Sequence, residues 1–419
     1  TTGSANVALG YQALLANTTG SNIVAIGQQA LEALTTGTEN TAVGYQALNA
    51  STDDACNTAL GFKAGLVASA GYNTFVGAEA GKAHTGASGC VYIGSHAGHN
   101  HTTGGNCVYI GRSAGGDSTT QNSDVMVGAY AGNESTLGDH VFLGESAGRY
   151  STTSIANTFV GRQAGKGDST NKLTGNDNVA VGAYAYDAAT TGTQNTACGR
   201  GGLGKCTTGS YNAAVGYASL PELTTGDYNS AIGRDAGGNL TTGDNNTFLG
   251  QDAGKSGSPS GQITTGSNIV CLGNGDITDL YCADTSISSS DARDKTDVAD
   301  FTKGLDWIKA LRPVTYRWDR RTWYGTDEEP YGTPDGSKKR DRLHLGFLAQ
   351  EALAVEQANG YGHNNDDSLI LNLTDDGMSY GMKYERLVPV LVNAIKELSA
   401  RVEELELSLI HISEPTRPY

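Results

Sequence analysis

The chain has 419 residues, 58 of them glycine, with a net charge of −16 and a pI near 4.8. This length allows two or more domains, and a glycine content about twice the usual share favours a repetitive architecture over one large globular core. The acidic balance argues against a nucleic-acid partner, which would require a basic face. The seven cysteines form no CxxC pair and no apolar run reaches membrane-spanning length, so neither a zinc site, a disulfide framework nor membrane insertion is predicted.

A glycine that follows an aliphatic residue recurs through the first 275 residues. The usual step is 17 residues, with two steps of 16, one of 21 and one of 23. The unit is N-[TV]-[AFY]-[VIL]-G-x-x-A-[LG], and many units continue into a TTG turn. Such a fixed period is typical of solenoids. The sixteen copies are Gly10, Gly27, Gly44, Gly61, Gly77, Gly94, Gly111, Gly128, Gly144, Gly161, Gly182, Gly199, Gly216, Gly233, Gly250 and Gly273.

Each unit predicts one short strand, because it contains a β-prone run of four residues that ends at glycine. Seventeen residues are too few for a helix pair but enough for one turn, or rung, of a β-roll. We therefore expect a mainly β fold in which residues 1–275 form a repetitive parallel β-roll, here called the shaft. Rungs about 4.8 Å apart would make it a rod on the order of 70 Å long.

Two positions of the repeat vary together in size. When the residue four after a repeat glycine is large, the residue two before the next repeat glycine is alanine, as for Leu31 and Ala42. When the first is glycine, the second is large, as for Gly81 and Tyr92; the clear exception is Gly165 with Ala180. We infer that the two positions share one slot between neighbouring rungs, since interiors tolerate neither voids nor overfilling. Pairing within one rung fits equally often and remains open.

The position four before the repeat glycine is asparagine in ten copies, which predicts an amide ladder or a turn cap. Cys90 and Cys107 occupy this position in adjacent rungs; a disulfide is conceivable, but two free thiols are favoured. His99 and His101, near His96, form an HxH motif, which is a weak signal for metal. No metal site and no cofactor are predicted. The ten asparagines are Asn6, Asn40, Asn57, Asn73, Asn157, Asn178, Asn195, Asn212, Asn229 and Asn246.

The NTAVG and NSAIG motifs resemble the head repeats of trimeric autotransporter adhesins. This resemblance implies a left-handed parallel β-roll shared by three chains. A physical argument leads to the same homotrimer: each rung has few apolar side chains, and joining three rolls would bury the remaining apolar face and cover open edges.

Four blocks follow in order from residue 290: SSDARDKTD, GLDWIKALRPVTYRWD, LHLGFLAQEAL and MKYERLVPVLVNAIKEL. Together they resemble the intramolecular chaperone of endosialidase family, which occurs at the C-terminus of phage tail fibres and tailspikes. The resemblance implies that residues 290–409 form an α+β domain that assembles three chains, helps the upstream β-structure to fold, and then cuts itself off. Residues 276–289 would be a linker. The TTG start suggests a longer protein before residue 1, and residues 410–419 resemble a non-native tail.

From the residues alone, the seam around Ser290 would be a Ser/Asp-rich hinge. The family motif Ser-Asp-x-Arg-x-Lys is filled by Ser290, Asp291, Arg293 and Lys295. The resemblance therefore implies that the chain is a serine endopeptidase that cleaves itself at Ser290, with Ser290 and Asp291 forming the cleavage site. Ser290 would be the nucleophile and Lys295 the general base. Asp294 stands where the family often has an apolar residue. Its carboxylate would favour the charged form of Lys295 and slow cleavage.

The last helix is expected to carry a seven-residue apolar stripe with steps of three and four. Such a stripe is typical of a coiled coil, and we expect it to be the trimerisation helix. The alternation of β-branched residues with leucine favours two strands, whereas the repeats and the family favour three. Packing on its own domain is the alternative. The stripe consists of Val388, Leu391, Ile395, Leu398, Val402, Leu405 and Leu409.

These features predict a virion tail-fibre protein made in the host cytoplasm, with a trimeric shaft that attaches to a receptor on the host surface and a self-cleaving chaperone. The alternative is a cell-surface adhesin, or an ice-binding repeat protein that presents its TTG threonines, with an inactive tail. A glycan-cutting tailspike is a third hypothesis, but the repeats place no two acids reproducibly together.

Overall fold

A computed structural model describes residues 2–258, 260–277, 292–326, 329, 331–373 and 380–413. The chain divides into two compact units. The first is Thr1–Pro259 with Ile263–Asn274, and the second is Ser260–Gln262 with Gly275–Tyr419. Among the described residues, no helix has the length and apolarity needed to span a membrane.

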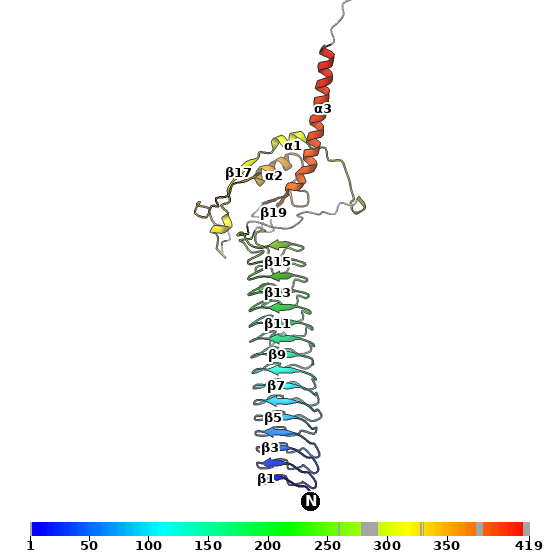
Figure 1. Cartoon of the computed structure of the whole chain (residues 1–419), viewed down its shortest axis with the longest axis vertical. Coiled ribbons are helices and arrows are strands. Elements are labelled where there is room, and N and C mark those ends of the chain that lie inside the picture. Colours follow the sequence, from blue (N-terminus) through cyan, green and yellow to red (C-terminus); the bar gives the residue numbers. More distant parts are fainter. Residues whose placement is uncertain are drawn as a thin grey trace, which may run out of the picture. The chain divides into compact units, whose positions relative to one another are not determined.

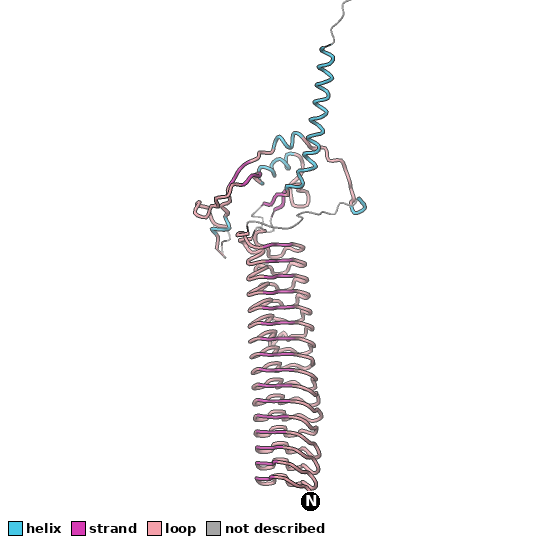
Figure 2. Tube along the Cα trace, in the orientation of Figure 1, coloured by secondary structure: helices cyan, strands magenta, loops and turns pink. Residues whose placement is uncertain are grey.

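The first unit is a parallel β-solenoid whose sixteen strands pair strictly in chain order, one strand per rung (Figures 1 and 2). Its rungs repeat at about 17 residues, so the predicted mainly β shaft is confirmed. The strands are β1 Val7–Leu9, β2 Val24–Ile26, β3 Thr41–Val43, β4 Thr58–Leu60, β5 Thr74–Val76, β6 Val91–Ile93, β7 Val108–Ile110, β8 Val125–Val127, β9 Val141–Leu143, β10 Thr158–Val160, β11 Val179–Val181, β12 Thr196–Cys198, β13 Ala213–Val215, β14 Ser230–Ile232, β15 Thr247–Leu249 and β16 Val270–Leu272.

The repeat glycine ends each strand because no other residue fits there. Gly27 has φ +129°, and a Cβ built on it would lie 2.5 Å from the carbonyl oxygen of Gly44 in the next rung. Both the backbone angle and the close approach therefore require glycine. The chain then turns through a residue with positive φ, such as Gln29 at φ 60°, and enters the next side of the rung.

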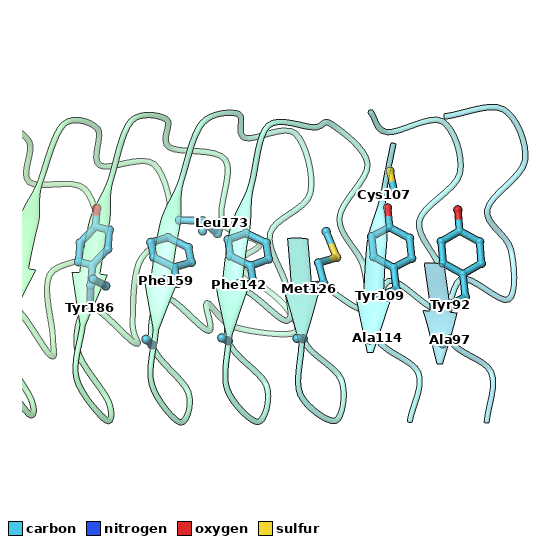
Figure 3. Packing of buried hydrophobic residues seen from close by; sticks show 14 of the residues in the cluster. Tyr92, Ala97, Cys107, Tyr109, Ala114, Met126, Phe142, Phe159, Leu173 and Tyr186 are labelled. Carbon is cyan, nitrogen blue, oxygen red and sulfur yellow. The ribbon is translucent and has the colours of Figure 1, made fainter. Parts of the chain in front are cut away.

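The middle residue of each strand from β2 onward points inward, and its two neighbours point outward, as the two-residue period of a strand requires. The inward residues form a continuous core with the residue three after each repeat glycine, an alanine in most rungs. Figure 3 shows part of this core, with Tyr92, Tyr109, Met126, Phe142, Phe159 and Tyr186 in one row. These side chains are completely buried within a single chain.

The size correlation has a different basis from the one expected. A Cβ on Gly165 would lie 2.3 Å from Phe159, which belongs to the same rung. Gly98 and Gly115 likewise face the tyrosines of their own rungs, Tyr92 and Tyr109. The preferred assignment to neighbouring rungs is therefore wrong for most of the rungs that have glycine at this position, and the exception at Gly165 is explained.

A side chain from the next rung faces the glycine where a rung with a small middle strand residue is followed by a rung with a large one. Gly65 follows a strand with the small Ala59, and there the ring of Phe75 from the next rung fills the slot. The same holds for Gly237, which faces Phe248 of the next rung as well as Leu220. At both positions the glycine therefore faces large side chains from the rungs on either side of it.

The second unit is a small α/β unit with a long C-terminal helix. Its buried core is formed around Trp307, Leu311, Ala352, Ile370 and Leu387. The β17–β18 and β19–β20 pairs are antiparallel. The elements are η1 Ala292–Asp294, α1 Leu305–Ala310, β17 Val314–Tyr316, η2 Arg321–Tyr324, β18 His344–Gly346, α2 Ala349–Ala358, β19 Leu371–Leu373, β20 Tyr380–Met382, η3 Tyr384–Arg386 and α3 Leu387–Ser413.

Candidate assembly and cleavage site

The predicted cleavage site is described only on its C-terminal side. Ser290 and Asp291 lie outside the described residues, so their assignment stays a prediction. Arg293 is in the short helix η1, and the backbone N–H of Lys295 donates to the carbonyl oxygen of Ala292 at 3.3 Å. Lys295 is exposed in the single chain. Because a lysine works as a base only when it is neutral, which burial favours, this position would have to be covered before it could act.

Helix α3 is held on its own unit by one face of its first three turns. Leu387, Val390 and Ala394 are buried against the core. The Nδ2 of Asn393 donates to the carbonyl oxygens of Phe301 and Lys303, at 2.5 and 3.3 Å. These contacts fix the direction in which the rest of the helix leaves the unit.

Glu397 adds a second anchor, because its Oε2 accepts a hydrogen bond from the backbone N–H of Leu305 at 3.1 Å. This N–H is in the first turn of α1, where helices leave such groups without a partner in the helix. A carboxylate there also interacts favourably with the helix dipole. Asn393 and Glu397 were not identified as contacts from the sequence; the only signal is that Asn393 precedes Ala394 and that Glu397 continues the three-and-four spacing of the buried face.

The predicted stripe on α3 faces away from this anchored face. Every one of its seven side chains is at least 43% exposed, and Ile395, Leu405 and Leu409 exceed 60%. The first turns of α3 do pack on their own domain, but they use other residues. The stripe therefore presents a continuous row of aliphatic side chains to solvent in the single chain.

A buried glutamate organises the domain beneath α3. Glu356 in α2 is fully buried, and its Oε2 accepts a hydrogen bond from the hydroxyl of Ser368 at 2.9 Å. Its Oε1 accepts from the backbone N–H of Ile370. A buried carboxylate requires such hydrogen-bond partners. The same bonds connect α2 to the segment that leads into β19.

The shaft has its own unpartnered apolar face. The third residue of every strand points outward and is aliphatic in fifteen of the sixteen rungs, with Cys198 as the exception. These residues are half-buried or exposed; Leu60 and Ile232 are 50% and 52% exposed. The sequence carried this signal as the aliphatic residue before each glycine. The shaft core, by contrast, is closed within one chain.

Polar ladders line other sides of the rungs, and the predicted amide ladder is present. The Oδ1 of Asn195 accepts from the backbone N–H of Asn212 at 3.0 Å, and its Nδ2 donates to the carbonyl oxygen of Gly209 at 2.8 Å. The first threonine of the TTG turns also bonds to the next rung, as Thr207 does to the carbonyl oxygen of Thr224 at 3.2 Å. Those hydroxyls therefore donate within the shaft.

The two ladder cysteines and His101 have structural roles. Cys90 and Cys107 are buried free thiols that contact the carbonyl oxygens of Gly104 and Gln121. His101 is buried, with Nδ1 2.7 Å from the hydroxyl of Tyr92 and Nε2 3.1 Å from the carbonyl oxygen of Gln121. Both of its ring nitrogens are engaged, so His101 does not form a metal-binding pair with His99.

Residues 290–361 match the model of the family described as Chaperone of endosialidase. The matched region begins at Ser290 and contains α1, β17, β18 and α2. No curated protein and no solved structure matches the chain. The match indicates a C-terminal chaperone unit for the folding and trimerisation of the β-solenoid that precedes it.

Proposed function

We propose that this chain is a trimeric tail-fibre protein of a virion whose C-terminal unit aligns three shafts, assists their folding, and then cuts itself off at Ser290. The observation that carries the proposal is the exposed heptad stripe of α3, on a helix anchored to a unit that matches a chaperone family. Three such stripes would bury one another in a coiled coil.

The outward aliphatic ladder of the shaft supports three copies along the whole rod. One chain leaves this ladder facing solvent over sixteen rungs. Three shafts that meet through their ladders would remove it from water, with a gain of about 25 cal/mol for each Å² of apolar surface. Such contacts depend on correct register, because a slip by one rung leaves a ladder end uncovered. An assembly helix that fixes the ends in register therefore has a physical purpose.

Cleavage would follow assembly because the proposed base is exposed in the single chain. In a trimer, neighbouring chains would cover Lys295 and favour its neutral form, which could then take the proton of the Ser290 hydroxyl. After cleavage, the shaft would no longer be connected to the chaperone unit. Its lifetime in the folded state would then depend on the height of its own unfolding barrier. Host attachment through a surface receptor follows from the tail-fibre role.

Mass spectrometry and multi-angle light scattering on freshly expressed protein test the proposal together. We expect wild type to yield a shaft fragment that ends at Ser290, and a particle of three chains. Ser290→Ala should stay uncut while the particle still contains three chains, and Lys295→Ala should also stay uncut. Normal cleavage of Ser290→Ala would refute the dyad, and a stable folded single chain in all variants would refute the assembly role.

A further inference from the structure

Three side chains with metal-binding atoms converge on the surface of the shaft. Glu79, His96 and His99 each offer one such atom, and these atoms all lie within 4.8 Å of one another. The Oε2 of Glu79 is 3.1 Å from Nε2 of His99 and 3.6 Å from Nε2 of His96. His99 and Glu79 are partly buried, with side chains 26% and 19% exposed.

The repeat brings these residues together. Glu79 and His96 are each the second residue after a repeat glycine, so the rung spacing places one above the other. The backbone N–H of His96 donates to the carbonyl oxygen of Ala78 at 2.9 Å. His99 follows in the same turn, and its N–H donates to the carbonyl oxygen of His96 at 3.3 Å. The backbone of two adjacent rungs therefore fixes all three positions.

The hydrogen bonds behind His99 orient it as a ligand. The Nδ2 of Asn100 donates to Asp117 at 2.8 Å, which turns its Oδ1 toward Nδ1 of His99 at 2.9 Å. Nδ1 of the neutral imidazole then carries the hydrogen, and the Nε2 lone pair faces the carboxylate of Glu79. Two acceptors at 3.1 Å require a cation or a proton between them. Partners of this kind are typical of the groups that orient metal-binding histidines.

We propose that Glu79, His96 and His99 bind a divalent transition-metal ion of the zinc class. A tetrahedral ion with bonds of about 2.0–2.1 Å separates its ligand atoms by about 3.4 Å, and the observed 3.1 and 3.6 Å lie on either side of this value. Two imidazoles and one carboxylate suit zinc, whereas calcium and magnesium prefer oxygen ligands. The fourth position faces solvent and would take water. The ion would connect two adjacent rungs.

Lys82 competes for the same carboxylate. Its Nζ is 3.2 Å from Oε2 of Glu79, the oxygen that both histidines approach. The ammonium neutralises the glutamate in the absence of metal and must move away when an ion binds. Removal of this ammonium should therefore strengthen metal binding, an effect that a nonspecific surface histidine would not show.

Isothermal titration of the tag-free chain with zinc chloride tests the site. We expect one ion per chain, affinity reduced at least about tenfold in Glu79→Gln and His99→Gln, and tighter binding in Lys82→Met. His363→Gln, an exposed histidine of the other unit, is the matched control and should bind as wild type does. Circular dichroism should show that each variant keeps the shaft.

Cobalt(II) absorption on the folded wild-type chain gives an independent readout. A visible spectrum typical of four-coordinate cobalt, absent in His99→Gln and abolished by excess zinc, would support the site. The proposal is overturned if wild type takes up no zinc, if Glu79→Gln and His99→Gln bind as tightly as wild type, or if binding is lost with His363 instead.

Discussion

The backbone N–H of His140 donates to Oδ1 of Asp124 at 2.8 Å, in the position where seven of the fifteen pairs of neighbouring rungs join two asparagines. Asp124 is fully buried, and burial raises its pKa from 3.8 to about 7. Because the pKa in the folded state is above that in the unfolded state, its contribution to stability is complete below about pH 4 and is lost as the pH rises through 7.

Asp124→Asn should therefore stabilise the shaft at high pH. The amide keeps the acceptor, restores the donor of the ladder, and carries no charge to bury. The gain over wild type should grow from pH 4 to 7 and reach at most about 4 kcal/mol above that range. Thermal melting of both proteins from pH 4 to 9 measures this difference; equal melting temperatures at every pH would contradict it.

His140 should make the shaft sensitive to acid. Its Nδ1 accepts from the backbone N–H of Asn157 at 3.2 Å, and its Nε2 donates to the carbonyl oxygen of Ser154 at 3.0 Å. It thus replaces an asparagine only as the neutral ring, and burial lowers its pKa from 6.5 to about 4. Since the folded pKa is the lower one, stability is present above pH 6.5 and is lost as the pH falls toward 4.

The measurement is the melting temperature of His140→Asn between pH 7 and 4. The variant should lose less stability in this range than wild type, although His101, whose pKa burial also lowers to about 4, will leave part of the effect. His363→Asn, at an exposed site, should follow the wild-type curve. Identical slopes for wild type and His140→Asn would disprove the role of the buried ring.

Phe159 and Gly165 should compensate for each other. Phe159→Ala leaves a cavity and should cost about 3–5 kcal/mol, and Gly165→Leu clashes with the ring. The double variant resembles the rung of Ala25 and Leu31, where leucine also has a positive φ. Its loss of unfolding free energy should therefore be at least about 2 kcal/mol smaller than the sum of the losses in the two single variants. Denaturant unfolding measures this coupling.

Gly148→Leu is the control for that cycle, because it belongs to the preceding rung and faces Phe142. Combined with Phe159→Ala, it should give no rescue. A rescue by Gly148→Leu in place of Gly165→Leu would restore the assignment of the slot to neighbouring rungs.

Leu405 and Leu407 of α3 offer a matched pair for the assembly helix. They are 62% and 60% exposed, but only Leu405 lies on the heptad stripe. In a Ser290→Ala background, which keeps the helix attached, Leu405→Asp should reduce the fraction of trimer seen by light scattering, because it buries a charge in the coiled coil. Leu407→Asp should leave it unchanged. An equal effect of both changes would argue against the stripe as the interface.

The repeat made the solenoid predictable, because the glycine at Gly27 and its equivalents can be placed only where rungs stack closely. The pairing of the two varying positions could not be predicted, because pairing within a rung and pairing between rungs agree with the sequence equally well. The contact of the Phe159 ring with Gly165 distinguishes the two alternatives. The proximity of Glu79 to His99 was not predicted, because the two are 20 residues apart and the HxH motif indicated His101 as the partner of His99. Ser290 remains a prediction from the motif alone.

The β10–β11 pair keeps its register although 21 residues separate the two strands. The added residues leave the rung through an exposed loop around Asn171 and do not enter the interior. Strand pairing thus joins each storey of the column only to the storeys next to it, and the ion pair between Lys172 and Glu134 reaches no further than two storeys. Strand pairing therefore sets no limit on the number of storeys. Duplication or loss of one repeat in the gene would lengthen or shorten the reach of the rod without a new fold having to evolve.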